Sequence, residues 1–219
     1  VLDTVQSLKP QNFITVISDE LIGFKEKLSE KYKRIKFAIQ KNRNGTADAV
    51  KVAMKQFKND KTSNTLILYG DTPLIKSKTL NKALNYFRKN NLDLCVLSMI
   101  PKSQENSYGR LYFENGTLSK IIEKIEITKD NITKCSDLCN TGIMIFNTKK
   151  LFRNIVKVQN NNKKKEYYLT DLVNIFYQNQ LKTGHFSCSE DECKGVNNMT
   201  ELSSINKIFQ RKKRDFYLE

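Results

Sequence analysis

The chain has 219 residues and a formal net charge of +15 at pH 7, from 38 Lys and Arg against 23 Asp and Glu. A chain of this length can bury a substantial core. Its basic residues are scattered beside abundant Asn, and they form neither an aromatic-and-basic stripe nor a known nucleic-acid-binding module. Only non-specific association with nucleic acids through the net charge therefore stays open. No apolar run reaches membrane-spanning length and no signal peptide opens the sequence. We therefore expect a soluble, cytoplasmic protein.

The cysteines and the single histidine do not predict a reactive or metal site. An odd number of cysteines in a chain of this size favours reduced thiols over a disulfide framework. The pairs Cys135/Cys139 and Cys188/Cys193 are spaced more loosely than the usual two-residue gap between zinc ligands, which makes a zinc site the less favoured interpretation. His185 lies in an apolar-flanked, strand-like run with no second base nearby, so we expect it to be structural.

Strand-like and helix-like segments alternate along the first half of the chain, as they do in βαβ units. Hydrophobic periodicity predicts helices over 1–8, 19–30 and 77–89, and one more helix whose N-terminus Thr46 caps. Strands are expected over 13–17, 35–39, 66–68 and 92–99.

The second half begins with short strands around turns. Runs of alternating apolar and polar residues over 108–113 and 118–127 flank the dipeptide Asn115-Gly116. This pattern strongly predicts a hairpin. The segments expected after them are a strand at 143–146, a helix capped by Thr148, a polar surface loop at 159–165, a helix ending at Gln178, a strand at 182–188 and a helix over 200–214. We interpret residues 1–219 as one mixed α/β domain, with about 103–134 as a hairpin insertion over one face.

The segment 66–75 places a carboxylate at the end of a strand. Its aliphatic residues predict a buried, parallel strand, after which Gly70 permits a sharp turn and Pro73 prevents the strand from continuing. Asp71 then stands beyond the carboxyl end of the strand, where open α/β sheets bind ligands. A rigid, lone carboxylate suits a hard metal ion, although an ordinary Gly-Asp turn also explains both residues.

Six motifs in this order resemble the uridylyltransferase domain of the bacterial bifunctional N-acetylglucosamine-1-phosphate uridylyltransferase/glucosamine-1-phosphate acetyltransferase family. The motifs are G-T-A-D-A-V (45–50), L-Y-G-D-T-P-L-I (68–75), Y-G-R (108–110) with E-N-G (114–116) and I-I-E-K (121–124), N-T-G-I (140–143), E-Y-Y-L-T-D-L (166–172) and G-V-N-N (195–198). The resemblance runs through essentially the whole chain. It implies an α/β, Rossmann-like nucleotidyltransferase (nucleotide-diphospho-sugar transferase) fold with a mixed, mostly parallel sheet.

The resemblance also implies an activity and a set of site residues. The reaction would form UDP-N-acetylglucosamine and pyrophosphate from UTP and N-acetylglucosamine 1-phosphate, for peptidoglycan and lipopolysaccharide precursors. It would depend on Mg²⁺ and need no strong general base, because the sugar phosphate is already ionised. The residues so implied are Asp71 and Asn197 as catalytic Mg²⁺ ligands, Gln40, Gly45, Thr46, Tyr69 and Gly70 at the nucleotide, and Gly109, Glu123, Asn140, Thr141, Tyr168 and Thr170 at the sugar.

The sequence also departs from that family. The Gly-rich loop with Arg and Lys that wraps the nucleotide phosphates is missing, as is the C-terminal left-handed β-helix, which holds most of the contacts of the family's trimer. Asn44 stands where an aliphatic residue is usual, and Asp48 where a histidine is common. Two alternatives therefore stay open: a related sugar-phosphate nucleotidyltransferase of other specificity, or a catalytically impaired fragment that binds a UDP-sugar.

Overall fold

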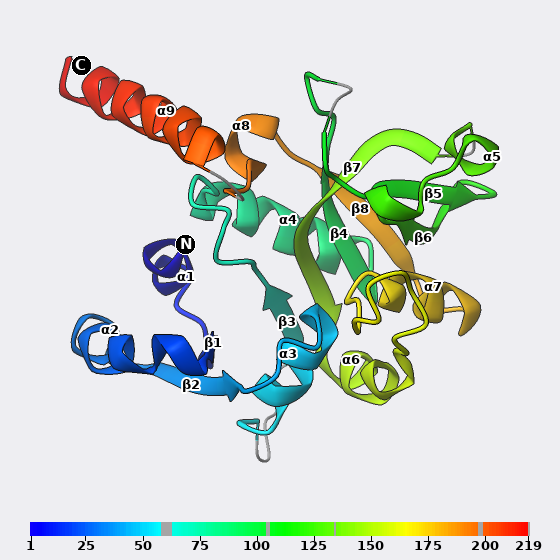
Figure 1. Ribbon diagram of the computed structural model, residues 1–219, viewed down its shortest axis with the longest axis horizontal. Coiled ribbons are helices and arrows are strands. Elements are labelled where there is room, and N and C mark those ends of the chain that lie inside the picture. The colour runs from blue at the N-terminus through cyan, green and yellow to red at the C-terminus, as the bar shows by residue number, and fades with distance from the viewer. Residues whose placement is uncertain (58–62, 104–105, 134, 197–198, 219) are drawn as a thin grey trace.

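The computed structural model describes residues 1–57, 63–103, 106–133, 135–196 and 199–218 (Figure 1). A parallel pair of strands, β1–β2, is separate from a larger sheet in which β6, β5, β7, β4 and β8 are successive neighbours and β3 pairs with β7. The strands are β1 (Phe13–Ser18), β2 (Ile35–Gln40), β3 (Asn64–Ile67), β4 (Leu94–Met99), β5 (Arg110–Glu114), β6 (Thr117–Ile122), β7 (Cys135–Asn147) and β8 (Thr183–Ser187).

The helices coincide with most of the predicted helical segments. The segment predicted as one helix over 19–30 is instead a 3₁₀ helix at Asp19–Phe24 followed by α2, and two further 3₁₀ turns occupy Lys124–Glu126 and Ile155–Lys157. Within the described part of the chain, no helix combines the length and apolar character needed to cross a membrane. The helices are α1 (Leu2–Ser7), α2 (Lys25–Lys31), α3 (Thr46–Met54), α4 (Ser77–Lys89), α5 (Lys129–Ile132), α6 (Thr148–Asn154), α7 (Asp171–Gln178), α8 (Glu190–Cys193) and α9 (Met199–Leu218).

β7 is the strand around which the larger sheet is built. It is antiparallel to β3, β4 and β5, whereas β4 and β8 are parallel to each other. The predicted strand at 143–146 is only the fully buried end of this 13-residue strand. The preceding part of β7 pairs with β5, a contact between distant segments that periodicity does not reveal.

The prediction of a parallel strand at 66–68 was wrong in direction. β3 is antiparallel to β7, with Leu66 opposite Ile145, and its four residues are half-buried. An aliphatic run shows that a strand is shielded from water, but its direction depends on which later segment returns beside it.

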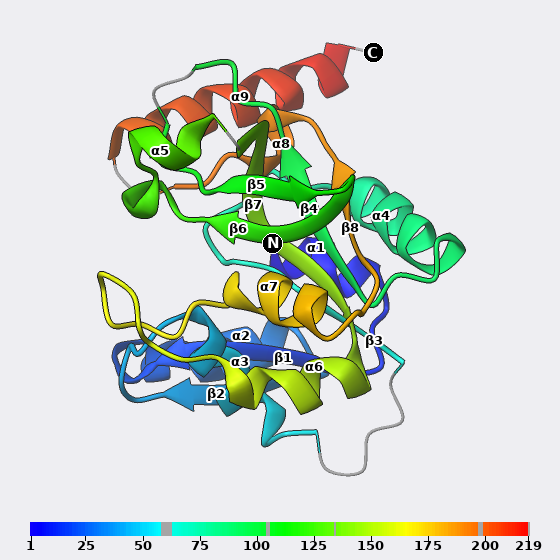
Figure 2. The same cartoon turned by 90° about the vertical axis from the view of Figure 1, so that its right-hand side faces the viewer.

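The hairpin is confirmed, but the prediction that it covers one face was wrong. Asn115 and Gly116 both have positive φ, 49° and 75°, as the tightest hairpin turns require. β5 pairs with β7, so the hairpin continues the sheet at its edge, with α7 packed against β6 (Figure 2).

The core lies on both faces of the larger sheet. Met144 and Phe146 of β7 pack with α6 and α7, where the rings of Phe146 and Phe176 are 5.7 Å apart. Ile143 and Ile145, on the opposite face, pack with α4. Successive residues of a strand point to opposite faces, so a continuous apolar run fits a sheet with helices on both sides. Each such fully buried side chain contributes about 1.5–3 kcal/mol.

Two predicted helix caps were also wrong. Gly45, with φ 115°, occupies the cap of α3, while the Thr46 hydroxyl accepts a hydrogen bond from the Leu169 backbone N–H at 2.9 Å. At α6 the cap is Asn147, whose side chain accepts from the Lys150 N–H, and Thr148 bonds Thr65 instead. Each threonine is the first residue of its helix, and its hydroxyl forms a hydrogen bond with a segment far away in the sequence.

Candidate active site

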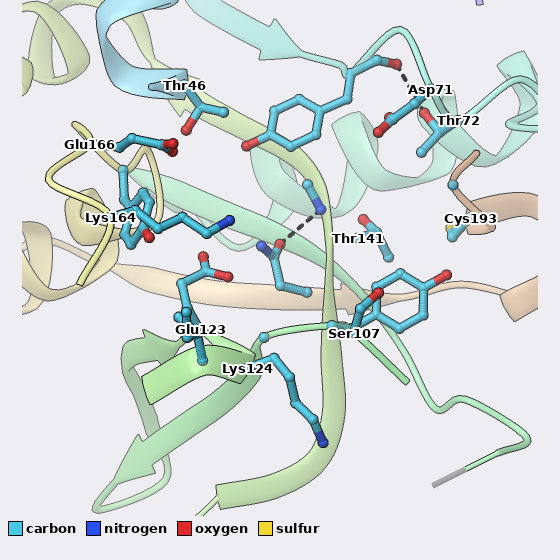
Figure 3. A pocket seen from close by; sticks show the side chains of 18 residues that line it. Thr46, Asp71, Thr72, Ser107, Glu123, Lys124, Thr141, Lys164, Glu166 and Cys193 are labelled. Atoms are coloured by element: carbon cyan, nitrogen blue, oxygen red, sulfur yellow. Dashed lines mark hydrogen bonds between the residues drawn. The ribbon is translucent and has the colours of Figure 1, made fainter. Parts of the chain in front are cut away.

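A cavity of about 600 Å³ opens where the chain leaves β3, enters β5, leaves β6 and crosses the middle of β7 (Figure 3). Most of the side chains predicted from the sequence line it, although they come from segments far apart in the chain. Those that line it are Thr46, Tyr69, Asp71, Gly109, Glu123, Asn140, Thr141 and Tyr168.

The remaining predicted residues are not among those that line the cavity, or they fall outside the described residues. Gln40 donates to the Gly45 carbonyl at 3.1 Å and to Asp48 at 2.8 Å, and so ties the end of β2 to the start of α3. Gly70 lies in the turn after β3, but a Cβ there would meet nothing within 4 Å and its φ is not positive, so the sharp turn does not require glycine. Asn197 falls outside the described residues.

Asp71 presents a carboxylate oxygen for which the described residues supply no hydrogen-bond partner. Oδ1 of Asp71 is buried and has no hydrogen-bond partner among the described residues. Burial raises the pKa of Asp71, and the charge of Glu201 adds to the effect. The Val196 N–H donates to the Asp71 carbonyl at 2.9 Å, which brings the segment before Asn197 to this point. A buried carboxylate oxygen without a partner fits a bound cation, which would compensate its charge.

Tyr69 packs tightly beneath the strand that carries Asn140. Burial raises the pKa of Tyr69 to about 12, an effect that the interaction with Thr46 partly offsets. Gly142 has φ 81°, and a Cβ at that position would lie 2.6 Å from two carbons of the Tyr69 ring. Glycine is therefore needed at 142 for both its conformation and its lack of a side chain.

A register shift in the sheet directs Asn140 and Thr141 toward the cavity. The pairing of β4 with β7 shifts between Val96 and Ser98, and Thr141 fills the irregularity by donating to the Leu97 carbonyl at 2.8 Å. Oδ1 of Asn140 accepts from the Gly142 N–H at 2.9 Å. This bond fixes the amide plane and leaves Nδ2 as a donor toward the cavity.

Glu123 stands at the end of β6 beside Gly109. Burial raises the pKa of Glu123, while the hydrogen bond from Thr170 favours the charged carboxylate. A Cβ at Gly109 would lie 3.2 Å from Oε2 of Glu123, so a larger residue would crowd the carboxylate. Thr170 does not line the cavity, but it orients a residue that does.

Several lining residues were not assigned from the sequence. Tyr108, Glu166 and Gly195 lie inside the matched motifs, a signal that could have identified them. Lys164 follows no recognisable pattern, yet it extends toward the carboxylate of Glu123, whereas Lys124 extends away from it (Figure 3). The loop that carries Lys164 is held by Asn162, whose side-chain oxygen accepts from the Glu166 N–H at 3.1 Å.

Within the described residues, no group of three or more His, Cys, Asp or Glu side chains could hold a metal ion. The cysteines there are all free thiols, and neither Cys135/Cys139 nor Cys188/Cys193 belongs to a larger group of possible metal ligands. His185 lies in β8 within 3.0 Å of the Ser98 hydroxyl, away from the cavity, where burial lowers its pKa.

Residues 5–191 match the model of the nucleotidyl transferase family. The match covers most of the chain. The chain belongs to the nucleotidyl transferase family. The described cavity is therefore the candidate active site of a nucleotidyl transferase, an enzyme class in which charged phosphates must be positioned.

Among curated relatives, the bifunctional protein GlmU of Wolbachia pipientis wMel is 34% identical over 220 residues, covering 100% of this chain and 49% of that protein. The bifunctional protein GlmU of Thermodesulfovibrio yellowstonii is 37% identical over 205 residues, covering 93% and 43%. The chain thus spans about half the length of the curated relatives it matches. These matches confirm the family resemblance inferred from the six motifs.

Solved structures show the same nucleotidyltransferase fold. A nucleoside-diphosphate-sugar pyrophosphorylase from Vibrio cholerae RC9 superposes with a TM-score of 0.68 at 14% identity, covering 93% of this chain and 84% of that one. The inositol-1-phosphate CTP transferase from T. maritima gives 0.64 at 11% identity, covering 86% and 71%. At such identities the likeness establishes the fold, and the predicted Rossmann-like nucleotidyltransferase class is confirmed.

Proposed function

We propose that this chain is the uridylyltransferase part of an enzyme that forms UDP-N-acetylglucosamine and pyrophosphate from UTP and N-acetylglucosamine 1-phosphate. The observation that carries the proposal is that one cavity gathers Asp71, Glu123 and Asn140 from three distant segments. The 34% identity to a bifunctional protein GlmU supports it. The product would serve peptidoglycan and lipopolysaccharide synthesis in a bacterial cytoplasm.

The proposed reaction needs alignment more than proton transfer. An ionised phosphate oxygen of the sugar phosphate attacks the α-phosphorus of UTP, and the bond from that phosphorus to the bridging oxygen of the β-phosphate breaks, so that pyrophosphate leaves. Both reactants are anions, so the site must hold them in line and offset their charge. A side chain that removes a proton has no role in this step, in agreement with the position of His185 outside the cavity lining.

The nucleotide would lie near Thr46, Tyr69 and Gly70, against the junction of β2 and α3 that Gln40 and Gly45 form. Asp71, with Asn197, would hold Mg²⁺, which supplies charge neutralisation at the phosphates when bound. Oδ1 of Asp71, which is buried and has no hydrogen-bond partner among the described residues, supports this assignment.

The sugar would lie against the opposite wall. The Glu123 carboxylate can accept hydrogen bonds from sugar hydroxyl or amide groups, and Nδ2 of Asn140 can donate one. Gly109, Thr141 and Tyr168 also line the cavity. Thr170 acts through Glu123.

The test assays the full gene product and the 219-residue chain side by side for pyrophosphate release from UTP, Mg²⁺ and N-acetylglucosamine 1-phosphate. We expect release by the full gene product, with no release when any one component is omitted. Absence of release by the correctly folded full protein would overturn the proposal.

A panel of nucleoside triphosphates and sugar phosphates defines the specificity. We expect UTP with N-acetylglucosamine 1-phosphate to give the highest kcat/KM. A higher kcat/KM with another pair of nucleoside triphosphate and sugar phosphate would show instead that the protein is a related sugar-phosphate nucleotidyltransferase of other specificity. If the full gene product bound UDP-N-acetylglucosamine without turning over any pair, the chain would be a UDP-sugar-binding protein.

A further inference from the structure

Two cysteine thiols are in contact at the wall of the cavity. Cys188 directly follows β8 and Cys193 ends α8, and their Sγ atoms are 2.8 Å apart. The Cys188 N–H and Sγ both donate to the Ser98 carbonyl, at 2.8 and 3.2 Å, so the position of this residue is fixed by β4. Cys193 is 1% exposed and lines the cavity, whereas Cys188 is half-buried and more accessible.

The other three thiols each contact an oxygen atom. Cys95 donates to the Val96 carbonyl, Cys135 to the Asn131 carbonyl, and Cys139 to the side chain of Asn106. Cys135 and Cys139 have nearly the same separation in sequence as Cys188 and Cys193, but they lie in one extended strand. Sequence spacing is thus similar in the two pairs, and only the fold brings one pair together.

We infer that Cys188 and Cys193 form a reversible intramolecular disulfide when the protein meets a small-molecule disulfide oxidant. A covalent S–S bond is about 2.05 Å long, so the two sulfurs need only a small displacement to reach it. The nucleotidyl transfer proposed for the cavity does not require this pair, and the inference does not depend on which nucleotide or sugar the cavity binds.

The oxidation proceeds by two thiol–disulfide exchanges. The more accessible Cys188, as its thiolate, attacks one sulfur of the oxidant, forms a mixed disulfide and releases one thiol of the oxidant. Cys193 then loses its proton and attacks Sγ of Cys188, which releases the second thiol. The protein loses two hydrogen atoms and gains one S–S bond, while the oxidant is reduced to two thiols.

The cross-link would restrain the segment that reaches Asp71. Residues 189–192 lie between the two cysteines, and the chain after Cys193 continues to Val196, whose N–H donates to the Asp71 carbonyl. Closing this short loop reduces the conformational entropy of the unfolded chain, and it links the end of α8 covalently to the end of β8. Oxidation is therefore expected to raise the Tm of the protein.

The experiment equilibrates the reduced protein with glutathione buffers of increasing disulfide-to-thiol ratio, alkylates the remaining thiols and digests with trypsin. Residues 183–194 form one tryptic peptide that contains both cysteines, and residues 135–149 form another that contains Cys135 and Cys139. We expect peptide 183–194 to escape alkylation and become two hydrogen atoms lighter, with about tenfold more disulfide than peptide 135–149 at the same ratio.

Two variants separate the steps. Cys193→Ser should accumulate a glutathione adduct on Cys188 that the unaltered protein resolves, and should lose the rise in Tm on oxidation. Cys135→Ser, which removes a thiol that donates to the Asn131 carbonyl, should behave as the unaltered protein. Full alkylation of peptide 183–194 at every ratio, equal oxidation of both peptides, or an unresolved adduct on Cys188 in the unaltered protein would each overturn the inference.

Discussion

The hydroxyl of Thr170 donates a hydrogen bond to Oε1 of Glu123 across 2.8 Å and thereby joins the start of α7 to the end of β6. The bond orients the carboxylate toward the cavity. It also opposes the effect of burial, which raises the pKa of Glu123. A residue that does not line the cavity thus helps to keep the carboxylate charged.

Replacing Thr170 with valine tests this relationship. The variant keeps the shape of the side chain but removes the donor, so the pKa of Glu123 should rise further. Activity that requires the ionised carboxylate should then be lost at a higher pH as the solution is acidified. We expect the acidic limb of the kcat/KM profile to move upward and KM for the sugar phosphate to rise roughly three- to tenfold, since a bond to a charged group is lost.

A matched control is Thr148→Val, which removes a hydrogen bond between the Thr148 and Thr65 hydroxyls away from the cavity. This change should lower Tm and leave the pH profile unaltered. An unshifted profile in Thr170→Val would contradict the positioning role of Thr170.

Asp71→Asn should separate activity from stability. The substitution removes the charge while keeping the shape, so kcat should fall at least about 100-fold if Asp71 holds the metal that offsets phosphate charge. Because burial raises the pKa of Asp71, its ionised form opposes folding at neutral pH, and the asparagine variant should unfold at an equal or higher temperature. Steady-state kinetics and thermal unfolding at pH 7 measure both effects. Retained turnover would show that the metal assignment is incorrect.

The sequence predicted local structure better than it predicted pairing. The helix over 77–89 was correct to the residue because Leu80, Leu84 and Phe87 recur at helical spacing, and this face of the helix packs into the core. The direction of β3 and the length of β7 were missed because both depend on partners far along the chain. Lys164 was missed for another reason: it lies in a polar loop whose path is set by Asn162.

Gly142→Ala should be strongly destabilising, and Gly116→Ala provides its control. Both glycines have positive φ, 81° and 75°, so alanine pays a similar conformational cost of about 1–2 kcal/mol at each. Only at 142 would the new Cβ also clash with the Tyr69 ring, whereas nothing lies within 4 Å at 116. Chemical denaturation should show that Gly142→Ala loses about 1–3 kcal/mol more than Gly116→Ala. Equal losses would mean that Tyr69 moves aside freely.

Asp171 predicts a specific dependence of stability on pH. Burial, together with the charges of Glu126 and Glu123, raises the pKa of Asp171 from 3.8 to about 6. Between these values the folded protein binds more protons than the unfolded chain, so the ionisation of Asp171 lowers stability as pH rises through this window. The penalty is complete above about pH 6 and absent below 3.8. Asp171→Asn, which cannot ionise, should therefore increase the free energy of unfolding at pH 7 and change it little at the acidic end of the window.

Urea denaturation at pH 7 and at the acidic end of the window measures the difference. Asp137→Asn on β7 is the control for the loss of one charge. A gain that is equal at both pH values would show that burial does not oppose the ionisation of Asp171.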